Sequence, residues 1–419
     1  MDTAAALDSC SHDSADLQVA IPDSPPHSTP ACDPLQCLTS LCHSLLRSGS
    51  LNLPPHFCQG LMQHQSPNLA EQGKEALGGG FAADGTEDTI VEGLPVHPLY
   101  VHLALALHRW ICERRFPRNL APIAGINEDE FWKSMLDAWT ETVVTQGSAL
   151  IELWQGIAIQ LDVQEPYSSL LKDGFKTVEG RCATDSYRSL RGGDLILVNE
   201  SFLLQIKEVH WYPTFRSMIE VEGLLKVLPG VDSISEGVKV YRKFYTEAKE
   251  QAHGVLGVHV VRPAQKDPVD LLAGILNALG MDGVRALLGL RTTIGTVKEA
   301  LPPPKSLLVD SFSALQNPDV AGCRITVGAR ALAKHVPRSL DGWWGSITGT
   351  EAEKNKLAES TLHRLMMHTV WMNIHLAPIP LFEIRVADGY GARWLADGSQ
   401  FRGFLEPPME EGYMKKWRH

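Results

Sequence analysis

Residues 170–198 read LLKDGFKTVEGRCATDSYRSLRGGDLILV, and this stretch decides the fold and the chemistry expected of the chain. Its centre, the segment KTVEGR at 176–181, places an amine, a hydroxyl, a carboxylate and a guanidinium around one glycine. A Gly-Gly-Asp turn follows at 192–194, and the apolar run at 195–198 has the composition of a strand. We therefore predict a functional site at 176–181, beside a strand and a tight turn.

The size and charge of the chain set the limits of its organisation. A length of 419 residues exceeds what one hydrophobic core supports, so two or three domains are expected. The formal charge of −11 argues against a surface coated in basic patches. The acidity is N-terminal, because residues 1–171 carry 21 Asp+Glu and 7 Lys+Arg, whereas residues 322–419 carry 10 and 13. A polyanionic partner should therefore be held by the later segments.

The eight cysteines are sparse over this length, and no secretory apolar segment precedes them, which favours free thiols in a reducing compartment. The spacing of Cys32, Cys37 and Cys42 in steps of five suits neither a CxxC knuckle nor one helix face, so neither a metal site nor a cofactor is predicted. No stretch approaches 18 uninterrupted apolar residues, so no membrane partner is expected. We predict a soluble intracellular protein of the cytoplasm or the nucleus.

Composition and periodicity divide the first 156 residues into two parts. Residues 1–93 are predicted to be disordered segment and linker, with one short amphipathic helix between Pro34 and Met62. Residues 94–156 should form a helical region with helices at 99–115 and 127–153, the second capped by Asn127. The acidic N-terminal segment could recruit protein partners.

The pattern then changes to short strands and helices, which is typical of a small mixed barrel at 157–263. The strands are expected at 157–163, 194–198, 202–211 and 255–261, and the helices at 165–173, 215–228 and 233–245. A helical connector follows at 264–321. In the C-terminal α+β module at 322–419, helices are expected at 330–335 and 351–367 and strands at 371–376 and 382–386.

The KTVEGR segment resembles an ASCH domain when it is taken with the features that follow it in order. These are Gly193-Asp194, the strand IKEVHWY, the helices that contain Glu222 and Tyr245, and the strand GVLGVHVV. The resemblance covers residues 160–263 and implies a fold similar to PUA domains, in a family thought to handle RNA or nucleosides. The flanking helices and the tail segments FEIRVADGYGARW and FLEP resemble the larger plant ASCH-domain proteins. The fold class predicted is therefore α+β, a PUA-like mixed β-barrel flanked by an N-terminal helical region and a C-terminal α+β module.

The candidate site residues combine cations, carboxylates and hydroxyls. Lys176 and Arg181 could bind a phosphate or polarise a carbonyl, and Glu179 and Glu222 could act as general base and acid. The structural alternative is an ion pair of Glu179 with Arg181 beside the turn, with Lys176 solvated. The residues predicted to bind ligand are Lys176, Thr177, Glu179, Arg181, Tyr245, Arg330 and Lys334, and those predicted to be catalytic are Lys176, Glu179 and Glu222.

Three features of the C-terminal module receive separate interpretations. Arg330 and Lys334 are spaced at i and i+4, which would form one phosphate-facing stripe on a helix. Trp343 and Trp344 could stack bases, although adjacent tryptophans more often form a partly buried edge. His375 is interpreted as a core histidine rather than a ligand.

Among small bacterial members of the resembled family, amidohydrolases remove the acyl group of acetylated cytidine with a lysine, a threonine and a glutamate. The lysine carries to Lys176 and the glutamate to Glu222, but the threonine position falls on Glu179. A carboxylate cannot replace an attacking hydroxyl without a change of mechanism. RNA or modified-nucleoside binding is therefore the favoured function. The alternatives are a hydrolase, either an amidohydrolase or a ribonuclease using Lys176 and Glu222, and a non-catalytic adaptor or coregulator scaffold.

Overall fold

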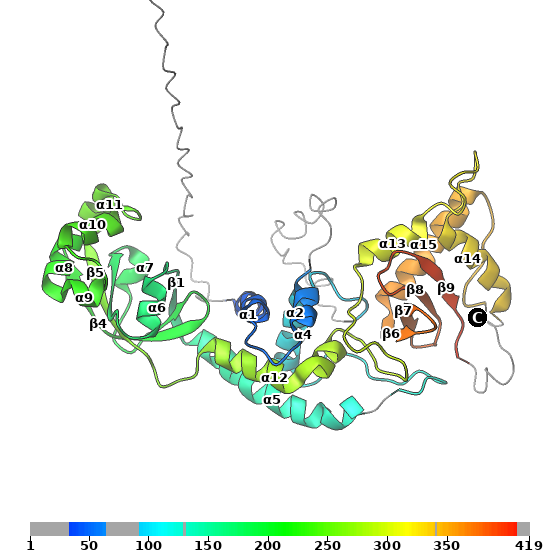
Figure 1. The fold of residues 1–419 in the computed structure, drawn as a ribbon, viewed down its shortest axis with the longest axis horizontal. Coiled ribbons are helices and arrows are strands. Elements are labelled where there is room, and N and C mark those ends of the chain that lie inside the picture. Colours follow the sequence, from blue (N-terminus) through cyan, green and yellow to red (C-terminus); the bar gives the residue numbers. More distant parts are fainter. Residues whose placement is uncertain (1–32, 64–91, 129–130, 340–341, 409–419) are drawn as a thin grey trace, which may run out of the picture.

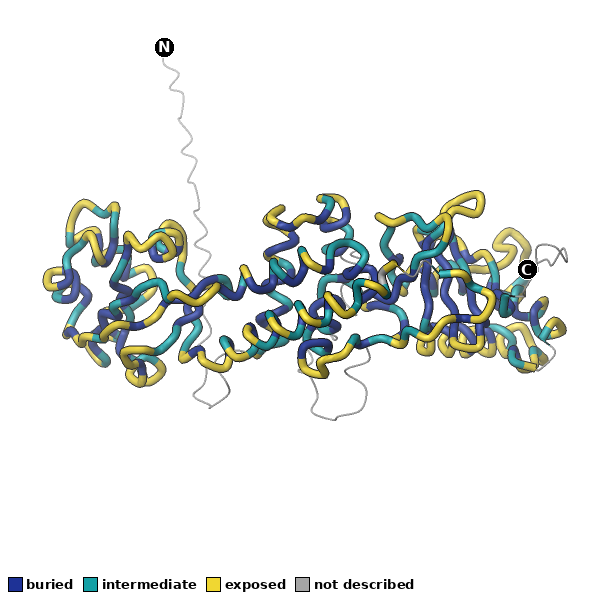
Figure 2. The backbone as a smooth tube through the Cα atoms, turned by 90° about the horizontal axis from the view of Figure 1, so that it is seen from below, coloured by how far each residue is buried: buried dark blue, intermediate teal, exposed yellow. Residues whose placement is uncertain are grey.

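The computed structural model describes residues 33–63, 92–128, 131–339 and 342–408. The disorder predicted for 1–32 and the linker predicted for 64–91 lie outside the described residues. The described chain is elongated, with three units side by side (Figures 1 and 2). A sheet of strands β1–β5 forms one end, a group of helices forms the middle, and a sheet of strands β6–β9 forms the other end.

The middle unit is a helical core. It comprises α1 (Pro34–Ser48), α2 (Pro55–Met62), α4 (Leu99–Glu113), α5 (Phe131–Gln155) and α12 (Pro268–Leu287). The two helices α1 and α2 replace the single one predicted there, because Gly49 adopts a left-handed conformation at φ 68° and ends the first. Helix α5 begins at Phe131, so the prediction that Asn127 caps it is wrong.

Five strands form the sheet that carries the KTVEGR segment. They are β1 (Ile157–Leu161), β2 (Val178–Cys182), β3 (Leu195–Val198), β4 (Phe202–Tyr212) and β5 (Val255–Val261). Their order is β1-β3-β4-β5-β2, with β1 parallel to β3 and the other pairs antiparallel. The strands predicted at 194–198, 202–211 and 255–261 are confirmed. Residues 178–181 of KTVEGR lie on the edge strand β2, and Lys176 and Thr177 directly precede it. The predicted α+β class is also confirmed.

Short helices flank this sheet. They are α6 (Tyr167–Lys172), α7 (Asp185–Arg188), α8 (Phe215–Glu222), α9 (Leu224–Val227), α10 (Ile234–Arg242) and α11 (Glu247–His253). The helix predicted at 215–228 is broken in two, because Gly223 has φ 91°. Helix α8 starts with a capping box between Thr214 and Ser217, and it buries Phe215 and Met218 against the outer side of β2 and β5.

The C-terminal unit places three helices on one face of a four-stranded antiparallel sheet (Figure 1). The helices are α13 (Lys305–Ser313), α14 (Val327–His335, continued by the 3-10 turn Val336–Arg338) and α15 (Glu351–Met367). The strands are β6 (Thr369–Leu376), β7 (Pro380–Val386), β8 (Gly391–Leu395) and β9 (Phe401–Leu405). Strands β8 and β9 were not predicted from the sequence, which led us to expect strands only at 371–376 and 382–386 in this unit. Alternate strand residues such as Ile374, Phe382 and Trp394 are fully buried and form the core with the helices.

Residues 264–321, predicted as a connector, divide their side chains between two cores. Helix α12 packs in the helical unit, whereas Leu308 and Phe312 of α13 are buried in the C-terminal unit. Within the described residues, no helix is long and apolar enough to cross a membrane. Cys37 is disulfide-bonded, so the prediction of free thiols is wrong there. The described cysteines with free thiols are Cys42, Cys58, Cys112, Cys182 and Cys323.

Gly180 is required by the packing of the edge strand. A Cβ atom at this position would lie 2.5 Å from the Tyr241 hydroxyl and 2.7 Å from the Met218 methyl, both in a buried layer. Gly180→Ala should therefore lower the free energy of unfolding by about 1–3 kcal/mol, as overpacking usually does. Urea unfolding followed by circular dichroism measures this. Gly156→Ala is the matched control, since its Cβ would come no closer than 3.5 Å to a neighbouring atom. Equal losses in the two variants would contradict the packing argument.

Candidate functional site

Lys176 is one of the most deeply buried charged side chains in the described chain, with a relative exposure of 2%. Its Nζ donates to the backbone carbonyls of Val178 at 2.6 Å and Val227 at 2.5 Å, and it lies 3.0 Å from Oε2 of Glu179. An ammonium group has three N–H donors, so each has a protein partner. Because Val227 belongs to α9, this side chain ties the edge strand to the helix that covers it.

Arg181 completes a triad with Glu179 and Lys176. Its Nε lies 3.0 Å from Oε1 of Glu179, and its Nη2 donates to the backbone carbonyl of Asp162 at 3.2 Å. Asp162 follows β1, at the opposite edge of the sheet from β2, so Arg181 bridges the two edges. Its side chain is 16% exposed. We define the three residues as the ion triad, which carries two cations and one anion.

The pKa values of the ion triad reflect competition between burial and attraction. Burial alone would raise the pKa of Glu179, but Lys176 and Arg181 outweigh it and hold that pKa below its usual value. Burial lowers the pKa of Lys176 despite the attraction of Glu179. Glu179 in turn raises the pKa of Arg181, against the effect of burial. Glu179 is therefore an ionised carboxylate at neutral pH.

Tyrosines surround the exposed side of the ion triad. Tyr245 shares a hydrogen bond with Arg181, as predicted residues of one site should, and Tyr187 is close enough to influence the same guanidinium. Tyr241 is close enough for Glu179 and Arg181 to shift its pKa, which is raised mainly by burial. Four of the eight tyrosines in the sequence lie at this edge of the sheet. Of these four, Tyr241 is buried and the other three are partly exposed. The tyrosine group is Tyr167, Tyr187, Tyr241 and Tyr245.

Glu222, the other predicted carboxylate, belongs to a different cluster. Its Oε1 accepts hydrogen bonds from the Tyr212 hydroxyl, from Nδ1 of His210 at 3.1 Å and from Nε2 of His259 at 2.8 Å. Burial alone would raise the pKa of Glu222, but these hydrogen bonds outweigh it and lower that pKa. In the described part of the chain, its hydrogen bonds and ion pairs do not include Lys176 or Glu179.

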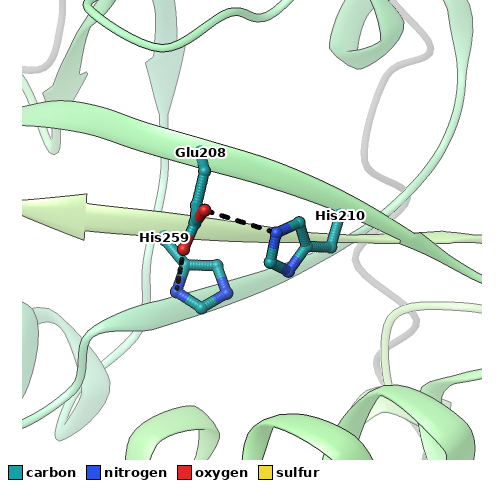
Figure 3. A group of neighbouring side chains, drawn as sticks. All are labelled: Glu208, His210 and His259. Atoms are coloured by element: carbon teal, nitrogen blue, oxygen red, sulfur yellow. Dashed lines mark ion pairs between the residues drawn. The ribbon is translucent and has the colours of Figure 1, made fainter.

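A second carboxylate, that of Glu208, lies beside both histidines of this cluster (Figure 3). The Oε2 atom of Glu208 lies 3.5 Å from Nε2 of His210, and its Oε1 atom lies 3.7 Å from Nδ1 of His259. One ligand atom from each of these three residues lies within 4.8 Å of the other two, a spacing that suits a metal ion. Prediction missed this group, although the alternation of Glu208, His210 and Tyr212 along one strand was a visible signal.

The remaining predicted residues make none of the ion triad's side-chain contacts. Thr177 follows Lys176 directly and joins the sheet through its backbone, which bonds to Lys226 and Val260. Arg330 and Lys334 are exposed on α14 in the C-terminal unit. The structure therefore brings together Lys176, Glu179, Arg181 and Tyr245, and it places Glu222, Arg330 and Lys334 elsewhere.

Trp343 and Trp344 occupy an edge of the C-terminal unit. Trp344 is buried and donates from Nε1 to Glu406, at 2.9 Å from Oε1. Trp343 is half-buried and already stacks on Tyr390 with ring centroids 4.3 Å apart, while Arg364 lies over its ring at 4.1 Å. Their faces are thus largely occupied by protein.

The face of the C-terminal sheet opposite its helices is polar. Pairing aligns Asn373, Glu383 and Arg393 across β6, β7 and β8. His375 lies on the same face of β6, with Nε2 3.9 Å from Oε2 of Glu383. Oε1 of Glu383 accepts from Nε of Arg385 at 2.5 Å. We call this group, with Arg402, the polar sheet face.

The polar sheet face holds an excess of positive charge. Burial lowers the pKa of Arg393; Glu383 opposes this effect, and the nearby cations Arg402 and Arg385 add to it. Nδ1 of His375 and Nε of Arg393 are buried and have no hydrogen-bond partner among the described residues. Buried polar atoms without partners are costly, so the protein itself leaves these two atoms unsatisfied at a cost in stability. The interpretation of His375 as a satisfied core histidine does not hold for Nδ1, which has no partner among the described residues, and it could not include the contact with Glu383, which strand pairing supplies.

The five-stranded mixed sheet with its short flanking helices defines the class of domain, and comparison with known families agrees. Residues 161–263 match the family model described as the ASCH domain, which confirms the resemblance seen in the sequence. The chain therefore contains an ASCH domain over these residues. The likeness to larger plant members stays a prediction. Residues 317–406, which include the polar sheet face, match the family model described as the CdiA C-terminal tRNase toxin domain.

Two solved structures are similar to part of this chain. The hypothetical protein PH0355 is 40% identical, with 24% of this chain and 94% of that chain covered and a TM-score of 0.24. The protein PF0455 from Pyrococcus furiosus is 38% identical, with 26% and 97% covered and a TM-score of 0.24. No curated protein matches this chain.

The pKa of Glu179 predicts how stability depends on pH. Because its folded-state pKa lies below the ordinary value of 4.5, the ionised carboxylate contributes stability that is present above pH 4.5 and is lost as pH falls through the folded-state pKa. Glu179→Gln should cost about 3–5 kcal/mol at pH 7, since two buried cations lose their counter-charge. The difference between wild type and variant should shrink on acidification.

Urea unfolding at pH 7, 5, 4 and 3 measures both proteins. Glu353→Gln serves as the control, because its carboxylate also has a lowered pKa but is exposed at a helix start. A wild-type-to-variant difference that is the same at every pH would refute the role given to the buried carboxylate.

Proposed function

We propose that the protein binds RNA, or a modified nucleoside within it, at the ion triad on the edge of its ASCH domain. The observation that carries this proposal is Arg181, a guanidinium held by a buried carboxylate at the one partly exposed position of the triad and bordered by tyrosines. Phosphate and base edges are both suited to a planar guanidinium, and unstacked bases pack on tyrosine rings.

Each member of the ion triad has a separate part in this proposal. Lys176 has all three donors occupied, so it positions Glu179 rather than contacting ligand. Glu179 fixes the orientation of Arg181, which reduces the entropy lost when a ligand is bound. Arg181 and the partly exposed Tyr245 make the contacts. The match to the ASCH family, in which RNA binding is the suggested activity, supports this assignment.

The earlier alternatives receive less support. Hydrolysis by Lys176 and Glu222 requires both groups at one reacting bond, whereas Lys176 is held by backbone carbonyls and Glu222 by Tyr212 and two histidines. An adaptor role rests on the acidic N-terminal segment, most of which lies outside the described residues.

A second candidate function is RNA cleavage by the C-terminal unit. Two observations favour it: the match to a tRNase toxin model over 317–406, and the polar sheet face within that match. The face offers a carboxylate and an imidazole 3.9 Å apart, together with cations that would attract a phosphodiester. These are the groups that general acid-base cleavage of RNA needs.

The reaction would be an internal transfer at phosphorus. Glu383 takes the proton of a ribose 2′-hydroxyl, and O2′ then forms a bond to phosphorus while the bond from phosphorus to O5′ breaks. The protonated ring of His375 gives its proton to O5′. The products are a 2′,3′-cyclic phosphate and a 5′-hydroxyl, and exchange with water restores both side chains. Arg393 and Arg402 would stabilise the charge on the phosphate oxygens.

Replacement of Arg181 tests RNA binding. Arg181→Ala should weaken binding of a single-stranded RNA roughly 10–100-fold, since charged hydrogen bonds of this kind contribute about 1.5–3 kcal/mol. Arg181→Lys should recover only part of the loss, because an ammonium lacks the planar fork. Fluorescence anisotropy at fixed salt concentration measures the affinity.

Arg216→Ala is the matched control for this experiment, because Arg216 is an exposed arginine of the same domain paired with Glu220. Circular dichroism and thermal unfolding establish that each variant is folded. If folded Arg181→Ala binds as tightly as Arg216→Ala, the proposed binding site is wrong.

Replacement of His375 tests RNA cleavage. His375→Gln should slow cleavage of transfer RNA by about 100-fold or more, because a general acid usually contributes at least that much. Gel electrophoresis and mass spectrometry measure the rate and identify the predicted cyclic phosphate end. His363→Gln, an exposed histidine on α15, is the control. Intact RNA after incubation with the wild-type protein, or equal rates for the two variants, would reject this candidate function.

A further inference from the structure

We propose that Glu208, His210 and His259 form a binding site for a divalent transition-metal ion of the zinc class on the outer face of the ASCH sheet (Figure 3). None of the RNA contacts proposed above uses these residues, so the two proposals stand or fall separately. The site is built from two adjacent strands, β4 and β5, and not from a loop.

Strand pairing brings the three ligands together. Glu208 and His210 are two positions apart on β4 and therefore point to the same face, and Glu208 lies directly opposite His259 on β5. The two imidazole rings are 4.8 Å apart between centroids. Two imidazole nitrogens and one carboxylate oxygen are a common ligand set for zinc in proteins.

The distances leave room for an ion among the ligands. The three ligand atoms lie within 4.8 Å of one another. Bonds of about 2.0–2.2 Å to a tetrahedral zinc ion would bring the atoms to about 3.4 Å apart. The carboxylate oxygens of Glu208 already lie 3.5 Å and 3.7 Å from the facing ring nitrogens of His210 and His259, so only small side-chain movements are needed.

Glu222 supplies the feature that separates a metal site from a chance group of histidines. Its Oε1 accepts from Nδ1 of His210 and from Nε2 of His259, which are the ring nitrogens that face away from Glu208. Each ring therefore carries its proton on the Glu222 side and presents a lone pair toward Glu208, at Nε2 of His210 and Nδ1 of His259. Metal-ligating histidines are oriented in this way by carboxylates in known zinc sites.

The chemistry at the proposed site follows from its openness. Three protein ligands leave a fourth position of a tetrahedral ion free, and Glu208 and His210 are exposed to solvent there. Water would fill that position. A carboxylate behind both histidines makes the rings more basic and strengthens their bonds to the ion.

The test is zinc binding to the full chain after treatment with a chelator. Isothermal titration with Zn²⁺ should show one equivalent in the wild type that is lost in Glu208→Gln and in His210→Gln. Both replaced side chains are largely exposed, so the fold should survive. Glu222→Gln should keep the site but weaken it about 10–100-fold, as loss of such a supporting carboxylate typically does.

His56→Gln is the matched control, because His56 also forms an exposed pair with a glutamate, Glu299, at 2.9 Å. It should bind zinc as the wild type does, including any zinc held by cysteine thiols. An absorption band of the Co²⁺-loaded wild type that is missing from His210→Gln would give independent support. If His210→Gln and Glu208→Gln retain the wild-type stoichiometry and affinity, the proposed site does not exist.

Discussion

The buried carboxylate of Glu179 is the constraint on which the architecture of the ASCH domain depends. A carboxylate removed from water is costly unless cations and hydrogen bonds replace its hydration, and here Lys176 and Arg181 supply both. The cations in turn need further partners, which they find in the carbonyls of Val227 and Asp162. The need to satisfy one charge thus links the edge strand to a covering helix and to the opposite edge of the sheet.

This constraint also determines which group of the triad can meet a ligand. An ammonium with three protein partners would lose one of them to any substrate, whereas a guanidinium has five donors in a fixed plane. The two cations also differ in burial, since Lys176 is 2% exposed and the side chain of Arg181 is 16% exposed. The lysine is therefore structural support, and the arginine is the cation of the triad that a ligand can reach.

Sequence patterns predicted features that depend on neighbouring residues and missed those that depend on pairing. Strand β5 and helix α15 followed from local periodicity, and the ion triad from chemistry concentrated in six residues. The partners of Glu222 are set by the register of β4 against β5, which residue spacing does not reveal. The polar sheet face combines residues of β6, β7 and β8, and the last of these strands was not recognised as a strand.

Both arginine-bearing sites belong to a chain with a formal charge of −11, and this affects how RNA can be bound. Net negative charge repels a polyanion at long range, but the effect fades beyond the screening length of about 8–10 Å in physiological salt. In the RNA binding proposed above, attraction would come from short-range contacts with Arg181 of the ASCH domain and with Arg393 and Arg402 of the C-terminal unit. The negative net charge weakens non-specific binding, because that binding depends on many phosphate contacts. A ligand that fits a preorganised arginine would lose little affinity. The acidic chain thereby favours selectivity over affinity.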